Sequence, residues 1–206
     1  MALVKLNNRG VRSATTFGSI SALGSMIFIK KLTASSDSEL SFVDGTSDVV
    51  LDDTYKEYLF TFNNIHPETD NADFTFNMST DAGSNYNVTK TTTVATAQHS
   101  EAGSDPGLFY VTADDLAQST AFQIVLGLIG NDADQSASGY LTLFNPSSTT
   151  FVKPFIAVGN SYYSGNYSLN DNTAGYGNTT SAVDAIRFQM STGNIDAGDI
   201  CLYGIN

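Results

Sequence analysis

The chain has little of several residue types, and each shortage excludes something. Its 206 residues include one cysteine, Cys201, so no internal disulfide can form, and this thiol is expected to pack as a small hydrophobe in an apolar strand. Tryptophan is absent, so the core must be built from the 13 Phe and 10 Tyr. No apolar run is longer than that of residues 26–29, which is far too short to span a bilayer as a helix.

Basic residues are also scarce, and they are unevenly placed. The chain contains nine Lys or Arg against 21 Asp or Glu, which gives a formal net charge of −12. Five of the nine precede the first acidic residue, Asp37, so residues 1–36 carry +5 and the remaining 170 residues carry −17. The acidic body argues against nucleic-acid binding and against adsorption to an anionic membrane, because phosphate groups are bound by dense Lys and Arg.

Residues 1–25 differ in character from the rest of the chain. They are rich in Ser, Gly, Asn and Ala, show neither helix nor strand periodicity, and lack the uninterrupted apolar core of a secretory signal. We therefore expect an extended basic arm over residues 1–25, and its scattered apolar side chains favour docking on a partner over an unanchored terminus. The residues expected to anchor the arm are Lys5, Arg9, Arg12, Phe17, Lys30 and Lys31.

From Met26 onward, apolar and polar residues alternate with a period of two. Tyr58, Phe60 and Phe62 share one strand face, and many other segments show the same alternation between clusters of Gly, Asn, Asp and Ser. This pattern predicts an all-β domain over residues 26–206, an antiparallel jelly-roll-like β-sandwich. The expected strands are 26–33, 38–43, 57–63, 73–79, 86–97, 107–112, 121–129, 140–144, 151–159, 161–169, 185–190 and 200–202.

Two segments break the simple pattern. In residues 140–144, Tyr140, Thr142 and Phe144 lie opposite Leu141 and Leu143, so this strand is predicted to be covered on both faces. Residues 112–118 are predicted to form one helical turn with a threonine cap.

Three parts of the sequence carry a resemblance to a known family. They are YLFTFNNIHPETD (58–70) with STDAGSNY (79–86), DLAQST (115–120) with SGYLTLFNPSS (138–148), and AIRFQMSTGNIDAGDICLYGI (185–205). Together they resemble virion structural proteins of tailed bacteriophages, especially marine ones, over roughly residues 26–205. The resemblance implies a β-sandwich subunit of the virion: a fibre, a knob or a capsid decoration. Together with the charge distribution, it leads us to expect a non-enzymatic structural protein, a homo-oligomer that docks on other capsid or tail proteins through its basic arm.

No residue pattern points to catalysis or to a bound cofactor. His66 and His99 have no nucleophile or carboxylate at triad spacing, so an enzyme such as a polysaccharide depolymerase is the weaker hypothesis. Residues 131–136 offer oxygen ligands at alternate positions, as calcium loops do, but lack the glycine and glutamate that complete an EF-hand. Asx turns on a solvated acidic surface are the alternative. No catalytic, metal or cofactor residue is assigned.

Tyrosines provide the better recognition candidates. Tyr162, Tyr163, Tyr167 and Tyr176 lie among Ser, Gly and Asn in residues 160–178. Tyrosine combines a rigid apolar face with a hydroxyl, which suits a sugar surface or a neighbouring subunit. The competing interpretation is that these rings pack on their own sheet. A receptor-binding module that recognises host surface glycans through this segment is therefore the alternative to a purely structural role.

Overall fold

The computed structural model describes residues 25–206, and twelve strands without any helix make up this part of the chain. The anchoring residues Lys5, Arg9, Arg12 and Phe17 lie outside the described residues. The strands are β1 (Met26–Asp37), β2 (Leu40–Val43), β3 (Glu57–Pro67), β4 (Ala72–Ser79), β5 (Lys90–Ser100), β6 (Gly107–Tyr110), β7 (Gln123–Ile129), β8 (Ala137–Phe144), β9 (Lys153–Tyr163), β10 (Tyr167–Gly177), β11 (Ala185–Met190) and β12 (Ile195–Ile205).

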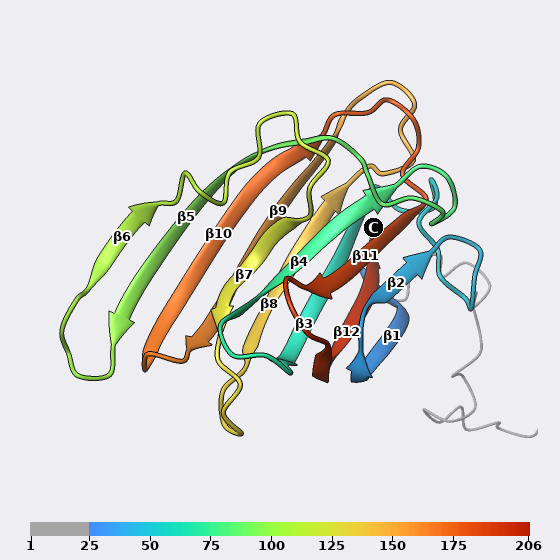
Figure 1. The fold of residues 1–206 in the computed structure, drawn as a ribbon. Helices are drawn as coiled ribbons and strands as arrows, with labels where there is room; N and C mark the ends of the chain where they lie inside the picture. The colour runs from blue at the N-terminus through green and yellow to red at the C-terminus, as the bar shows by residue number, and fades with distance from the viewer. Residues whose placement is uncertain (1–24) are drawn as a thin grey trace, which may run out of the picture.

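The strands form two layers that pack face to face (Figure 1). The large layer has the order β1-β12-β3-β8-β9-β10-β5-β6, and the small layer has the order β2-β11-β4-β7. One residue pair, Ile129 with Tyr163, joins the two layers where β7 meets β9. All pairings are antiparallel.

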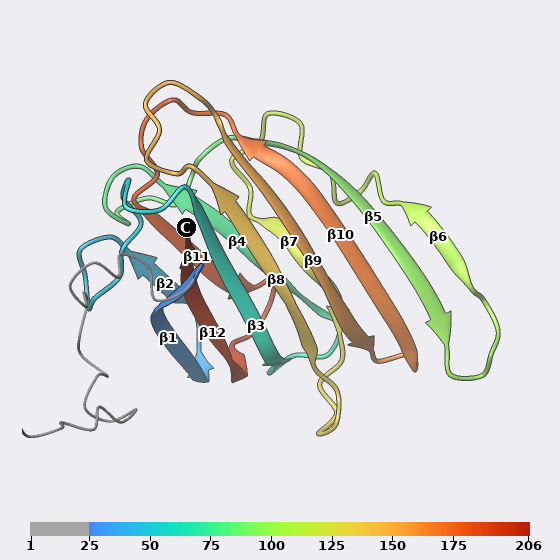
Figure 2. The same ribbon diagram turned by 180° about the vertical axis from the view of Figure 1, so that it is seen from behind.

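Eight of these strands have the arrangement of a jelly roll. Strands β1-β12-β3-β8 face β2-β11-β4-β7, and the chain moves between the layers as two Greek keys. The predicted all-β, jelly-roll-like sandwich is therefore confirmed. Strands β9, β10, β5 and β6 are added beyond β8 and extend the large layer past the edge of the small one (Figures 1 and 2).

The core between the layers is aromatic. Phe188 of β11 is fully buried; its ring stacks on Phe74 at 5.6 Å and meets Phe62 edge-on at 5.2 Å. Rings from both layers surround it, because β3 in the large layer and β4 in the small layer each turn alternate residues inward. The other rings around Phe188 are Phe42, Phe60 and Phe76. Cys201 of β12 is buried, as expected for a small hydrophobe.

The helical turn expected over residues 112–118 is wrong, because its backbone groups bond elsewhere. The Leu116 N–H donates to the Thr92 hydroxyl at 2.8 Å, and the Thr92 N–H donates to the Leu116 carbonyl at 2.9 Å. The Asp115 carboxylate accepts the Val94 N–H at 2.8 Å. The segment therefore runs as turns fastened to β5 rather than as a helix.

Two predictions about strands also need correction. The break expected near residue 160 lies instead at residues 164–166, where the Asn166 N–H closes a turn on the Tyr163 carbonyl at 2.9 Å with a left-handed φ of 62° at Asn166. Strand β8 is covered on its inner face, but on its outer face Tyr140 is 43% exposed, so residues 25–206 do not cover both sides. Among residues 25–206, no helix could cross a membrane.

Replacing Phe188 with Ala is expected to destabilise the domain by about 3–5 kcal/mol, because the substitution leaves a cavity among five rings. Urea unfolding of the full chain measures this loss. Phe151, which is 67% exposed, provides the matched control, and Phe151→Ala should change the free energy of unfolding by less than about 0.5 kcal/mol. Equal losses in the two variants would contradict the central role of Phe188.

Candidate functional site

Three of the four candidate tyrosines come together at the β9–β10 hairpin. Tyr162 and Tyr163 end β9, Tyr167 begins β10, and the rings of Tyr163 and Tyr167 lie 5.8 Å apart. Tyr176 lies at the opposite end of β10, paired with Pro154 and Thr91. The tyrosines are thus strand residues, not members of one loop, and only the hairpin gathers them.

The hairpin tyrosines are held by acidic residues of the neighbouring β5–β6 connection. The Tyr162 hydroxyl donates to Glu101 Oε1 at 3.0 Å, and the Tyr167 hydroxyl donates to Asp105 Oδ2 at 3.2 Å. These bonds to the carboxylates raise the pKa of both phenols. A hollow of about 300 Å³ opens beside them, lined also by His99, Asn160 and Ser168. Its donors and acceptors suit ligand hydroxyl groups.

A second hollow, of about 560 Å³, lies where the large layer projects beyond the small one. The Phe109 ring of β6, 49% exposed, and the side chain of Leu128 line it on the apolar side. Asp73, Asp114 and Asp171 line it on the polar side. Sequence reasoning missed this hollow, since its carboxylates come from β4, β10 and the turn after β6.

Two of these carboxylates have a structural task in a bulge of β7. The pairing of β7 with β4 is irregular at Gly127 and Leu128, and Leu128 has a left-handed φ of 53°. Asp171 Oδ2 accepts the Gly127 N–H at 2.8 Å, and Asp73 Oδ1 accepts the Leu128 N–H at 2.9 Å. Burial raises the pKa of Asp171, and burial together with neighbouring carboxylates raises the pKa of Asp114.

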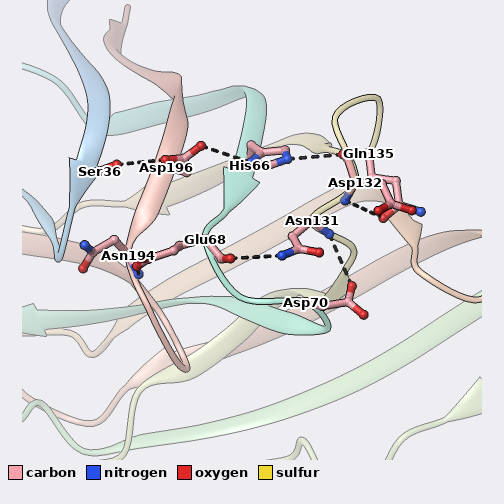
Figure 3. A network of polar contacts seen from close by, with 9 residues as sticks. All are labelled: Ser36, His66, Glu68, Asp70, Asn131, Asp132, Gln135, Asn194 and Asp196. Atoms are coloured by element: carbon pink, nitrogen blue, oxygen red, sulfur yellow. Dashed lines mark hydrogen bonds and ion pairs between the residues drawn. The ribbon is translucent and has the colours of Figure 1, made fainter.

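A polar network occupies one end of the sandwich around His66 (Figure 3). His66 Nε2 lies 3.3 Å from the Asp132 carbonyl and therefore donates to it, while Nδ1 faces Asp196 Oδ2 at 3.6 Å. The Ser36 hydroxyl donates to the other Asp196 oxygen at 2.8 Å. The carboxylate thus stands between hydroxyl and imidazole, whereas a catalytic triad needs the imidazole between the other two groups. This network does not activate Ser36 as a nucleophile.

The acidic loop over residues 131–136 is organised by its own hydrogen bonds. The Asp132 N–H donates to Gln135 Oε1 at 3.1 Å, and the Asn131 side chain donates to the Glu68 carbonyl at 3.0 Å (Figure 3). In the part of the chain that the structure describes, no three His, Cys, Asp or Glu side chains are grouped to hold a metal ion. The Gln135 N–H also donates to the Asp132 carbonyl at 2.8 Å, so the loop between β7 and β8 is a backbone turn that Asn131 ties to the end of β3.

Two lysines are fully buried near the ends of β5 and β9. Lys90 and Lys153 both pair with Gly177 of β10, one on each side, and both point into the sandwich. Lys90 Nζ donates to Asn77 Oδ1 and to the Val88 carbonyl, and burial lowers its pKa to about 7. A lysine with a lowered pKa can act as a nucleophile, but a side chain without solvent exposure meets no substrate.

The buried ammonium group of Lys153 also has hydrogen-bond partners, because its Nζ donates to three backbone carbonyl oxygens at 2.7–3.1 Å. Burial lowers its pKa as well. The two lysines hold loop carbonyls in place at this end of the sandwich. The sequence signal for them is a lysine at the inward position of an alternating strand, as in Lys90, Thr92 and Val94.

Comparison with protein-family models, with curated proteins and with solved structures finds no match to this chain.

The lowered pKa of Lys90 predicts a pH-dependent stability. Between its folded value of about 7 and its ordinary value of 10.5, the unfolded chain binds more protons than the folded one, so stability should rise with pH in this window. Lys90→Met should flatten this rise, measured as urea midpoints at about pH 7.5 and about pH 9.5. Lys56 is exposed, and Lys56→Met should keep the wild-type rise. An unchanged slope in Lys90→Met would contradict the burial of a titrating amine.

Proposed function

We propose that this protein is a non-enzymatic structural protein of a bacteriophage virion, a capsid decoration or fibre-type subunit docked on other virion proteins through its basic residues 1–25. Three residue stretches support the proposal by their resemblance to virion structural proteins of tailed phages. The jelly roll supports it in a general way, because this fold recurs in viral capsid proteins, although it also serves lectins and enzymes.

The proposal that the protein docks through residues 1–25 is supported by the distribution of positive charge. In residues 25–206, Lys90 and Lys153 are buried, Lys31 pairs with Asp199 at 3.1 Å, and Arg187 pairs with Glu39 at 2.7 Å. Lys30 and Lys56 are the other basic residues of this part of the chain. Most of the basic residues left for an acidic partner are therefore at positions 5, 9 and 12 of the sequence.

Deletion of residues 1–25 should leave a folded domain that no longer enters particles. The twelve described strands begin at Met26, so the truncated protein should unfold at a temperature close to that of the full chain. Occupancy is measured by quantitative mass spectrometry of purified virions after complementation. A truncated protein that is folded and present at normal copy number would contradict docking through this segment.

A triple substitution tests the positive charge of residues 1–25 in the same assay without shortening the chain. Replacing Lys5, Arg9 and Arg12 together with Ala should lower occupancy and make it more sensitive to salt, because charges set encounter rate and register. The matched control replaces their neutral neighbours Asn7, Asn8 and Ser13 with Ala. Equal occupancy in the two triple variants would show that the basic charges are not used.

The second candidate function is recognition of host surface glycans at the β9–β10 hairpin. The observation that favours it is the hollow of about 300 Å³ beside Tyr162 and Tyr167, which presents hydroxyl, amide and carboxylate groups beside aromatic rings. Aromatic faces stack on sugar rings, and the polar groups bind their hydroxyls. This role is compatible with a place on the virion.

Tyr162→Ala should weaken binding of the full chain to purified host polysaccharide at least about tenfold, the loss expected for one recognition aromatic. Tyr176→Ala is the control, because Tyr176 lies at the other end of β10 and should leave binding unchanged. Binding that is absent from the wild-type protein, or lost equally in both variants, would rule out the hairpin as a glycan site.

A further inference from the structure

The outward-facing strand residues of the extended part of the large layer include no Asp, Glu, Lys or Arg. Carboxylates lie only at its margins, where Glu101 accepts from Tyr162 and Asp115 bonds the Tyr110 hydroxyl. We call this surface, formed by the outward-facing residues of β8, β9, β10, β5 and β6, the open face. The charged residues of these five strands, Lys90, Lys153 and Asp171, all point inward and are buried. In a chain with a net charge of −12, a five-stranded surface without such charges is a strong local exception.

Large apolar side chains of the open face are exposed within the described residues 25–206. The row across its centre, matched by strand register, is Tyr140, Val158, Asn172, Ala95 and Tyr110. Tyr140 is 43% exposed and Tyr110 is 60% exposed. No other described segment lies across this side of the sheet, as Figure 2 shows.

Three asparagines of the open face already have hydrogen-bond partners within the sheet. Asn160 donates its amide N–H groups to Ser168 Oγ and to the Leu169 carbonyl, Asn170 donates to the Gly159 carbonyl, and Asn172 donates to Asn170 Oδ1. Both N–H groups of Asn160, and one N–H group each of Asn170 and Asn172, therefore keep a partner when water is removed from this face.

The open face has a hollow and a ridge side by side. A hollow of about 510 Å³ lies over the small residues Ala95 and Ala174, between Tyr110 on one side and Ile156 on the other. Leu108 and Tyr110 form a ridge along β6, beside the hollow. In a pair related by a two-fold axis, the ridge of each copy can occupy the hollow of the other.

We propose that the open face binds a second copy of this chain, forming a two-fold dimer by face-to-face packing of the two large layers. Strands about 4.8 Å apart with about 3.3 Å per residue give the five-stranded face a flat area of about 600 Å². Side chains enlarge the accessible area toward the roughly 800 Å² per partner that stable interfaces bury. Two acidic molecules repel least when the surfaces that meet carry little charge, which favours this face for self-association.

A carboxylate at the centre of the open face tests the proposal. Ala95→Glu would bury two unpaired charges in the dimer, so dissociation should become at least about 100-fold easier. The measurement is sedimentation equilibrium of the full chain across micromolar concentrations. The wild type should show twice the monomer mass of 21.9 kDa, and the variant should show the monomer mass.

Ala197→Glu is the matched control, because it adds the same charge at an exposed position of β12, outside the open face. It should associate as the wild type does. Far-UV circular dichroism and thermal unfolding show whether each variant is folded, and Tyr110→Ser provides a second, uncharged probe of the ridge. A monomeric wild type, or folded Ala95→Glu and Tyr110→Ser variants that associate like Ala197→Glu, would overturn the proposal. The proposed dimer does not depend on a place in the virion.

Discussion

The contact of Phe188 with rings from both layers is the interaction on which the architecture depends. Its neighbours come from β2, β3 and β4, so a single side chain of β11 ties the small layer to the large one. A one-residue slip of any of these strands would turn its phenylalanines to the outside, and the aromatic cluster therefore also sets the strand register. Because the aromatic cluster between the layers stabilises the domain, the outer side of the large layer is free to bind a partner.

The alternation of apolar residues was enough to predict the strands and the sandwich, because inward and outward positions differ in the sequence itself. Tyr58, Phe60 and Phe62 are all buried on one face of β3. The end of β9 could not be predicted, because Gly159 resembles a turn residue. It instead permits close approach of β8, since a side chain there would collide with Leu126 and with the Ser138 carbonyl.

The grouping of site residues was less accessible to sequence reasoning. The separation of Tyr176 from Tyr162 and Tyr167 follows from the length of β10. The hollow beside Phe109 follows from the pairing of β5 and β6 with β10, a strand far from them in the sequence. Apolar residues on both sides of residues 140–144 predicted a strand covered on both faces, but within residues 25–206 only the inner face is covered. The open face lies in a different part of the sequence from the basic positions 5, 9 and 12. The proposed attachment and the proposed self-association can therefore be separate properties.

The edge strand β6 has a consequence for solubility. Its outer backbone groups have no partner among the described strands, and its sequence Leu108-Phe109-Tyr110 is apolar, a combination that invites uncontrolled growth of a sheet by strand addition. Pro106 precedes the strand, Asp114 and Asp115 follow it closely, and it is only four residues long. Pro106 lacks a backbone N–H, and the carboxylates repel other acidic chains, so both discourage another strand from pairing with β6. The exposed edge of β6 can therefore stay unpaired without starting fibril growth.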